Sequence, residues 1–262
     1  MWNLEFISEE DFDTHVTETV RAYEDNLEPY DVRKFNRNII DPVKMVFDKS
    51  VYGYTWEEII KSEIFRQRDK SNTNSIGYFH QNIFEYIEGC KVPPQVWDVV
   101  FMPGRDFEIG GGQQVSAVYV EMKNKHNTMN SSSSAKTYMK MQNQLLHDDN
   151  CACFLVEAIA KNSQNIPWAV TVDGNRQKHE RIRRVSLDQF YALVTGDDDA
   201  FYKVCMALPS AIERVLASTP DLGAPRDTVL DELRQTAANN ETAMLMSLYL
   251  LGFSSYLGFD VV

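Results

Sequence analysis

An acid and a lysine stand two residues apart at the end of an apolar segment, in Glu121-Met122-Lys123. The six residues before them, 115–120, read Val-Ser-Ala-Val-Tyr-Val and predict a β-strand. Because successive side chains of a strand point to opposite faces, the carboxylate of Glu121 and the ammonium of Lys123 would share one side. Burial of such charges costs on the order of several kcal/mol per ion unless something compensates them. A divalent cation and a phosphate would compensate both, as in a metal-dependent nuclease.

A second carboxylate, Asp98, opens a short apolar strand upstream. Three glycines at 110–112 predict a hairpin-like turn before the strand that carries Glu121. For the triplet alone, the alternative interpretation is a surface ion pair between Glu121 and Lys123. Asp98, the turn and the basic, hydroxyl-rich stretch after Lys123 together favour the nuclease interpretation.

Hydrolysis of a phosphodiester needs a positioned water, neutralisation of charge at phosphorus and help for the leaving oxygen. Hard divalent cations favour oxygen ligands, so Mg²⁺ is the expected cofactor. We expect the carboxylates of Asp98 and Glu121 to bind the metal, with the backbone carbonyl of Met122 as a candidate third ligand. Lys123 would orient or help deprotonate the attacking water and stabilise the charged transition state.

The charge of the chain is uneven. A net charge of −12 argues against general affinity for nucleic acids. Residues 1–90 carry 18 acids and 10 bases, and residues 188–262 carry 11 acids and 4 bases. By contrast, 123–147 holds four lysines and no acid, and 174–187 holds five bases and one acid. These two segments are typical of a DNA-binding cleft, although a solvated surface is the alternative for the second.

The two basic segments supply the candidates for contacts with double-stranded DNA. The candidate residues are Lys125, Asn127, Asn130, Ser132, Ser133, Lys136 and Lys140 in the first, and Arg176, Lys178 and Arg181 in the second. An arginine can bond guanine in two places, which suits a G/C-rich site. Phosphate contacts usually outnumber base contacts, so most of these residues are expected to position the duplex. A palindromic target read by a small enzyme predicts a two-fold homodimer.

Helices are expected on both sides of the central strands. The expected helices are 8–23, 31–49 with a bend or restart at Asp41-Pro42, 55–68, 76–89, 133–147, 187–193, 200–217, 227–237 and 241–251. A polar loop is expected at 71–75, and buried strands are expected at 152–156 and 168–172. The apolar run at 244–251 suits either a core or a subunit interface.

No run of 18 apolar residues occurs, so no membrane span is expected. The first five residues lack the features of a signal peptide. Four scattered cysteines at 90, 151, 153 and 205 form no metal-ligand spacing, so a zinc site is not expected. These features predict small buried thiols in a reducing cytoplasm.

Four stretches resemble the PD-(D/E)xK nuclease core, in the order helix, Trp-Asp strand, hairpin, Glu-x-Lys strand, helix and strand. They are NSIGYFHQNIFEYIEG (74–89), WDVVF (97–101), VYVEMKNKHNTMNSSSSAKTYMKMQNQL (118–145) and RVSLDQFYALVTG (184–196). The closer resemblance, over about 70–215, is to type II restriction endonucleases of the group that cuts GGNCC-type sites. Trp97 stands where the motif often has proline, which leaves Asp98 in place.

The resemblance implies an α/β fold with a restriction-endonuclease-like core, in which a mixed β-sheet is flanked by helices. It predicts a single endonuclease domain over 1–262, with a helical N-terminal region (1–70), a catalytic core (71–196) and a helical C-terminal region (197–262).

The implied activity is sequence-specific cleavage of duplex DNA to 5′-phosphate and 3′-hydroxyl ends, with a cognate DNA methyltransferase as genetic partner. The resemblance also implies that an acid on the helix before the first core strand, Glu85, reaches the metal site. The alternatives are a structure-selective repair or junction nuclease of the same fold and a non-catalytic DNA-binding protein. The intact charged triplet argues against the last of these.

Overall fold

The structure is a computed structural model that describes residues 2–218, 226–236 and 241–253. Its helices are α1 (Glu9–Asn26), α2 (Val32–Arg37), α3 (Pro42–Tyr52), α4 (Trp56–Asn82), α5 (Ser131–His147), α6 (Leu187–Thr195), α7 (Ala200–Ala217), α8 (Val229–Thr236) and α9 (Glu241–Phe253), with a 3₁₀ helix η1 (Ile83–Tyr86). Its strands are β1 (Cys90–Lys91), β2 (Val99–Phe101), β3 (Phe107–Glu108), β4 (Gln114–Val115), β5 (Ala117–Lys125), β6 (Cys151–Ile159), β7 (Asn165–Val172) and β8 (Asn175–Ser186).

The chain forms two compact units, each built from two segments. The sheet unit comprises Met1–Val20 and Ser75–Thr219, and the helical unit comprises Arg21–Asn74 and Pro220–Val262. This division into units leaves the single endonuclease domain over 1–262 as a prediction. Across the described ranges, no helix combines the length and apolarity that crossing a bilayer would need.

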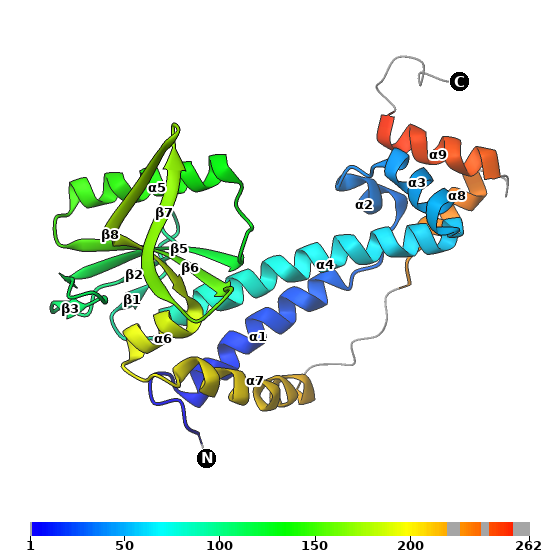
Figure 1. The fold of residues 1–262 in the computed structure, drawn as a ribbon. Coiled ribbons are helices and arrows are strands. Elements are labelled where there is room, and N and C mark those ends of the chain that lie inside the picture. The colour runs from blue at the N-terminus through cyan, green and yellow to red at the C-terminus, as the bar shows by residue number, and fades with distance from the viewer. Residues whose placement is uncertain (1, 219–225, 237–240, 254–262) are drawn as a thin grey trace. The chain divides into compact units, whose positions relative to one another are not determined.

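A six-stranded sheet with the order β1-β2-β5-β6-β8-β7 organises the sheet unit (Figure 1). The pairs β5–β6 and β6–β8 are parallel, whereas β1–β2, β2–β5 and β7–β8 are antiparallel. The central strand β6 is buried over 151–157, as expected for a parallel strand that is covered on both faces. This mixed sheet with flanking helices confirms the predicted fold class.

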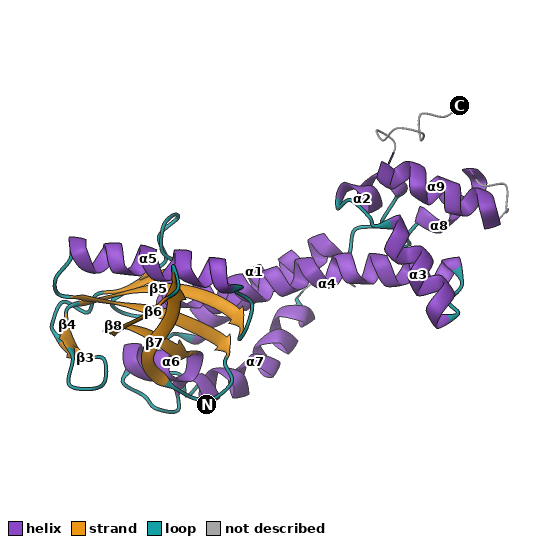
Figure 2. Ribbon diagram, turned by 45° about the horizontal axis from the view of Figure 1, so that its top comes forward, coloured by secondary structure: helices purple, strands orange, loops and turns teal. Residues whose placement is uncertain are grey.

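The two faces of the sheet have separate apolar cores, and α5 and α6 lie on opposite faces (Figure 2). On the α5 side, Tyr138 and Met141 pack against alternate residues of β5 and β6. On the other side, Phe190 of α6 packs with Val120 and Phe154. The odd-numbered residues of β5 therefore face α5, and Glu121 and Lys123 belong to this face.

The helical unit has its own core, in which Phe35, Ile60, Val229 and Leu248 are all buried. The burial of Leu248 places part of the predicted apolar run 244–251 in the core rather than at a subunit interface. Arg68 and Asp227 form a two-bond ion pair inside this unit, with N–O distances of 2.7 and 3.0 Å.

The expected loop at 71–75 is wrong, because α4 runs without a break from Trp56 to Asn82. Serine, threonine and asparagine disfavour a helix interior only weakly, and local contacts can outweigh that preference. Here the Ser71 hydroxyl donates to the Gln67 carbonyl at 3.3 Å, and the Asn72 side chain accepts from Asn26 at 2.9 Å.

The expected restart at Asp41-Pro42 is confirmed. Asp41 is the N-cap of α3, and its side chain accepts a hydrogen bond from the Lys44 N–H at 3.0 Å. Pro42 occupies the first turn of α3, where a missing N–H costs nothing.

Candidate active site

The backbone of β5 fixes the position of Asp98, which lies directly before β2. Its N–H donates to the Val120 carbonyl at 2.9 Å, and its Oδ2 accepts from the Met122 N–H at 2.6 Å. Val99 pairs with Val120 in the antiparallel register, so β2 begins where the acid-x-Lys triplet starts. The carboxylate of Asp98 is therefore held beside the triplet by main-chain contacts rather than by a flexible surface pair.

Glu121 and Lys123 form an ion pair, with 2.6 Å between Nζ and Oε1. This contact shows that the two side chains share one face of β5, as strand alternation predicts. A second lysine reaches the same carboxylate from α5, with 2.7 Å between Lys140 Nζ and Glu121 Oε2. Each oxygen of Glu121 therefore accepts from an ammonium group.

The two carboxylates have pKa values pushed in opposite directions. Burial raises the pKa of Asp98, the Met122 N–H opposes this shift, and the charge of Glu121 adds to it. Burial also acts to raise the pKa of Glu121, but the hydrogen bonds from Lys123 and Lys140 outweigh it and hold that pKa below its usual value. The paired lysines thus keep Glu121 ionised, which is the state that a metal ligand needs.

The donor atoms fit a hard divalent cation. A strand residue points its N–H and C=O to the same side, so the Met122 carbonyl faces the side on which Asp98 receives the Met122 N–H. Two carboxylates and a carbonyl form an oxygen-only set, which suits Mg²⁺. The described residues contain no group of three or more His, Cys, Asp or Glu side chains arranged for a metal. The oxygen atoms available beside the triplet belong to two carboxylates and the main chain.

Glu85 lies on η1, where its side chain is exposed. In the described part of the chain no contact joins it to Asp98 or Glu121, and the three acids do not form a metal-binding group. Its approach to the metal site stays a prediction from the resemblance.

The first basic segment surrounds the start of α5. Asn130 is the N-cap of this helix, and its Oδ1 accepts from the Ser133 N–H at 2.8 Å. Lys125, Asn127, Ser132, Ser133 and Lys136 are exposed, whereas the side chain of Lys140 pairs with Glu121. Asn127 has a φ of 63°, a left-handed conformation that asparagine tolerates better than most residues.

The second basic segment forms β8, a long strand that the sequence analysis did not anticipate. Arg184 is level with Glu121, because both pair with Leu155 of β6. Arg176 lies eight residues earlier, about 26 Å away at the usual rise of a strand. Arg176 and Lys178 are exposed near the β7–β8 turn, while Arg181 donates to the Cys151 carbonyl at 3.1 Å.

The inner residues of β8 therefore do not add to an exposed basic surface. Arg183 is buried and donates to the side chain and the carbonyl of Asn165, the latter at 2.7 Å. Arg184 forms an ion pair with Glu157 of β6. Arg183 and Arg184 point to opposite faces of the sheet, as consecutive strand residues do, and each has a partner there.

Glu157 of β6 lies beside Lys123 of β5, and the sequence analysis did not select it as a site residue. It pairs with Lys123 in the β5–β6 register, it is only 2% exposed, and its carboxylate contacts Arg184 and the Nδ1 of His126. A cavity of about 130 Å³ adjoins this cluster. The signal in the sequence was a lone acid inside the apolar segment 151–159.

Replacing Glu157 with glutamine is expected to lower the free energy of unfolding by about 3 kcal/mol, because it leaves a partly buried arginine without its counter-ion. Urea denaturation of the two proteins measures this difference. The matched control is Glu180→Gln, which removes the exposed pair with Lys178 and should cost roughly 0–1 kcal/mol. Equal losses in both variants would contradict a structural role for the buried pair.

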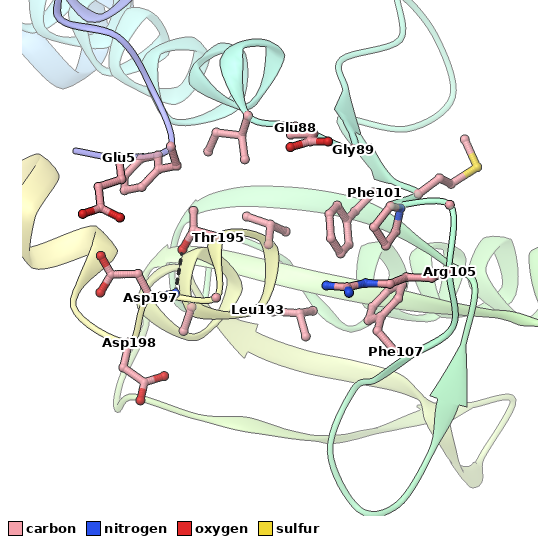
Figure 3. A pocket seen from close by; sticks show the side chains of 18 of the residues that line it. Glu5, Glu88, Gly89, Phe101, Arg105, Phe107, Leu193, Thr195, Asp197 and Asp198 are labelled. Atoms are coloured by element: carbon pink, nitrogen blue, oxygen red, sulfur yellow. Dashed lines mark hydrogen bonds between the residues drawn. The ribbon is translucent and has the colours of Figure 1, made fainter.

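A larger cavity, of about 1460 Å³, opens at the other end of β2 from Asp98 (Figure 3). Phe101 and Phe107 contribute apolar surface to it. Its charged lining residues are Glu5, Glu88, Arg105, Glu108, Asp197, Asp198 and Lys203. Five acids against two bases repel a phosphate backbone, so this cavity does not suit DNA.

A mixed sheet that carries an acid and a lysine on the inner strand β5, with a second acid beside them at the start of β2, defines a restriction-endonuclease-like protein. The model of the Eco47II restriction endonuclease family matches residues 4–217. The chain is 29% identical over 248 residues to the type II restriction enzyme Sau96I of Staphylococcus aureus, covering 91% of each chain. It is 30% identical over 227 residues to the type II restriction enzyme Eco47II of Escherichia coli, covering 82% of this chain and 88% of that protein.

The chain therefore belongs to the Eco47II restriction endonuclease family. Membership confirms the resemblance to type II restriction endonucleases and the expected class of enzyme, a sequence-specific deoxyribonuclease.

Proposed function

We propose that this protein cuts both strands of duplex DNA at a GGNCC-type site by Mg²⁺-dependent hydrolysis, leaving 5′-phosphate and 3′-hydroxyl ends. The observation that carries the proposal is the convergence of Asp98, Glu121 and Lys123 at the second half of β5, where Asp98 accepts from the Met122 N–H and Lys123 pairs with Glu121, each at 2.6 Å. These residues correspond to the acid and the Glu-x-Lys of a PD-(D/E)xK motif.

In this proposal Asp98, Glu121 and the Met122 carbonyl hold the metal. Bound there, Mg²⁺ supplies charge neutralisation at phosphorus and a more acidic water. Lys123 lies on the same face as Glu121, from which its ammonium can orient the attacking water and stabilise charge on the phosphate oxygens.

The exposed residues around the start of α5 are the proposed DNA contacts nearest to the active site. The N-terminus of a helix attracts anions, because its first N–H groups are free and its dipole is positive there. Lys125 and Lys136 add charge on either side of this turn, and Ser132 and Ser133 add hydroxyl donors.

Arg176 and Lys178 are proposed to reach a more distant part of the duplex, because they lie near the β7–β8 turn. Arg181 is already bonded to the main chain, and we assign it the support of the loop before β6.

One chain carries one Glu-x-Lys site, whereas a double-strand cut needs two hydrolytic events. We therefore infer a two-fold homodimer acting on a palindromic site, with one active site for each strand. A methyltransferase of matching specificity would protect the host's own sites, and the cytoplasm is the compartment where both enzymes would meet DNA.

Incubation of the purified protein with phage DNA and Mg²⁺ tests the proposal. Discrete fragments are expected, and run-off sequencing of the cut ends should place every cut at one GGNCC-type sequence. A smear would contradict specificity, and cleavage confined to flaps or junctions would replace the proposal with a structure-selective nuclease. Retardation of DNA in Ca²⁺ without any cleavage in Mg²⁺ or Mn²⁺ would instead identify a non-catalytic DNA-binding protein.

A further inference from the structure

Three groups surround the ammonium of Lys140, which projects from α5. Glu121 Oε2 lies 2.7 Å away, the Val96 carbonyl accepts a second hydrogen bond, and the ring of Trp97 lies 4.0 Å from Nζ at its centroid. The side chain is one third exposed. A free lysine side chain loses up to about 2 kcal/mol of rotamer entropy when it is fixed, so contacts with three partners indicate a held position.

The carboxylate of Glu121 is fully engaged by lysines. Lys123 occupies Oε1 and Lys140 occupies Oε2. A cation that binds Glu121 through both oxygens, or through the oxygen nearer α5, has to displace an ammonium. The two lysines thus take the place of the positive charge that the metal would bring.

The contacts indicate which ammonium leaves. Among the described residues, Lys123 forms its ion pair with Glu121, which lies two residues away on the same strand. Lys140 has two further partners, the Val96 carbonyl and the face of Trp97, and both remain after it releases Glu121. Release therefore costs Lys140 less, and it leaves the ammonium beside the site rather than in bulk water.

We infer that Lys140 is a second active-site lysine that competes with the divalent cation for Glu121 and then contacts the phosphate being cut. The inference rests on the proposed function and adds to it a role for a residue outside the Glu-x-Lys triplet. Val96 and Trp97 precede Asp98 directly, so the anchor of Lys140 is part of the same chain segment as the first metal ligand. Once released, the ammonium has a free N–H for a non-bridging phosphate oxygen.

The variant Lys140→Met keeps the length of the side chain and removes its charge. Two measurements test it: Mg²⁺ affinity of the DNA-free protein by calorimetric titration, and the single-turnover cleavage rate at saturating Mg²⁺. We expect Mg²⁺ to bind about tenfold more tightly, because no ammonium must be displaced, and cleavage to slow about tenfold or more. Opposite changes in affinity and rate distinguish this role from a structural one, which would weaken both.

The matched control is Lys91→Met, an exposed lysine on the edge strand β1, where Mg²⁺ affinity should equal that of the wild type. In a Glu121→Gln background, Lys140→Met should no longer raise Mg²⁺ affinity, because the shared ligand is gone. Lys140→Arg keeps the positive charge, so its Mg²⁺ affinity and its cleavage rate should both stay within the order of magnitude of the wild type.

Unchanged Mg²⁺ affinity in Lys140→Met would overturn the inference, even if the wild type cuts DNA as proposed. Tighter Mg²⁺ binding with an unchanged cleavage rate would overturn the contact with phosphate. Conversely, a wild type that cuts no DNA would refute the proposed function, and the affinity measurement would still decide whether Lys140 competes for Glu121.

Discussion

Glu121→Gln is expected to lower the rate of DNA cleavage by about 1,000-fold or more. The amide keeps the shape of the side chain but removes the charge that both lysines and the metal require. A metal ion at a transferring phosphate supplies several kcal/mol of transition-state stabilisation, and each 1.36 kcal/mol is tenfold in rate. Single-turnover cleavage of a plasmid at saturating Mg²⁺ measures the loss.

The same variant should remain folded and should bind target DNA, because Glu121 is a metal ligand in this scheme and repels phosphate when no metal is present. The matched control is Glu213→Gln on α7, an exposed acid that should cut at the wild-type rate. Cleavage by Glu121→Gln within tenfold of the wild-type rate would remove Glu121 from the metal site.

Lys123→Met is expected to slow cleavage by about 100-fold to 10,000-fold, the usual range for loss of a positioned acid–base group. Its ammonium lies 2.6 Å from Glu121, and in the proposed mechanism it orients the attacking water and stabilises charge on the phosphate. Binding of target DNA in Ca²⁺ should change much less, because one phosphate-facing charge is a small part of a DNA interface. Rates and equilibrium binding are measured on the same DNA fragment.

An exposed lysine on the edge strand β1 supplies the control, since Lys91→Met removes the same charge away from the site. Its rate should match that of the wild type. If Lys123→Met cuts as fast as the control, activation of water has to be assigned elsewhere, and the double variant with Lys140→Met then shows whether the second lysine substitutes for the first.

Local rules were sufficient to predict the arrangement of the Glu-x-Lys triplet. Alternation along β5 put Glu121 and Lys123 on one face, and two-residue spacing in an apolar strand does not depend on the rest of the fold. The sequence also placed Asp98 at the start of the short apolar strand upstream, and the antiparallel pairing of β2 with β5 brings it to the Met122 N–H. The restart of the helix at Asp41-Pro42 was readable for the same reason, because a cap and its helix are neighbours in sequence.

The second basic segment shows what composition cannot resolve. Five bases within 174–187 predict a basic surface, but in the strand β8 Arg183 bonds to Asn165 and Arg184 pairs with Glu157, while Arg176 lies about 26 Å from the level of Glu121. The loop expected at 71–75 failed similarly, since the weak preferences of single residues were outweighed by contacts from elsewhere.

By itself the sequence determined that Glu121 and Lys123 share one face of a strand, because a two-residue spacing is local, and its motifs showed which family the chain resembles. Only the tertiary structure decided that Lys140 reaches Glu121 across 19 positions and that Glu157 and Arg184 form a buried pair across 27. Such contacts depend on the register of β5, β6 and β8 and on the packing of α5 against them, and neither is encoded in local spacing.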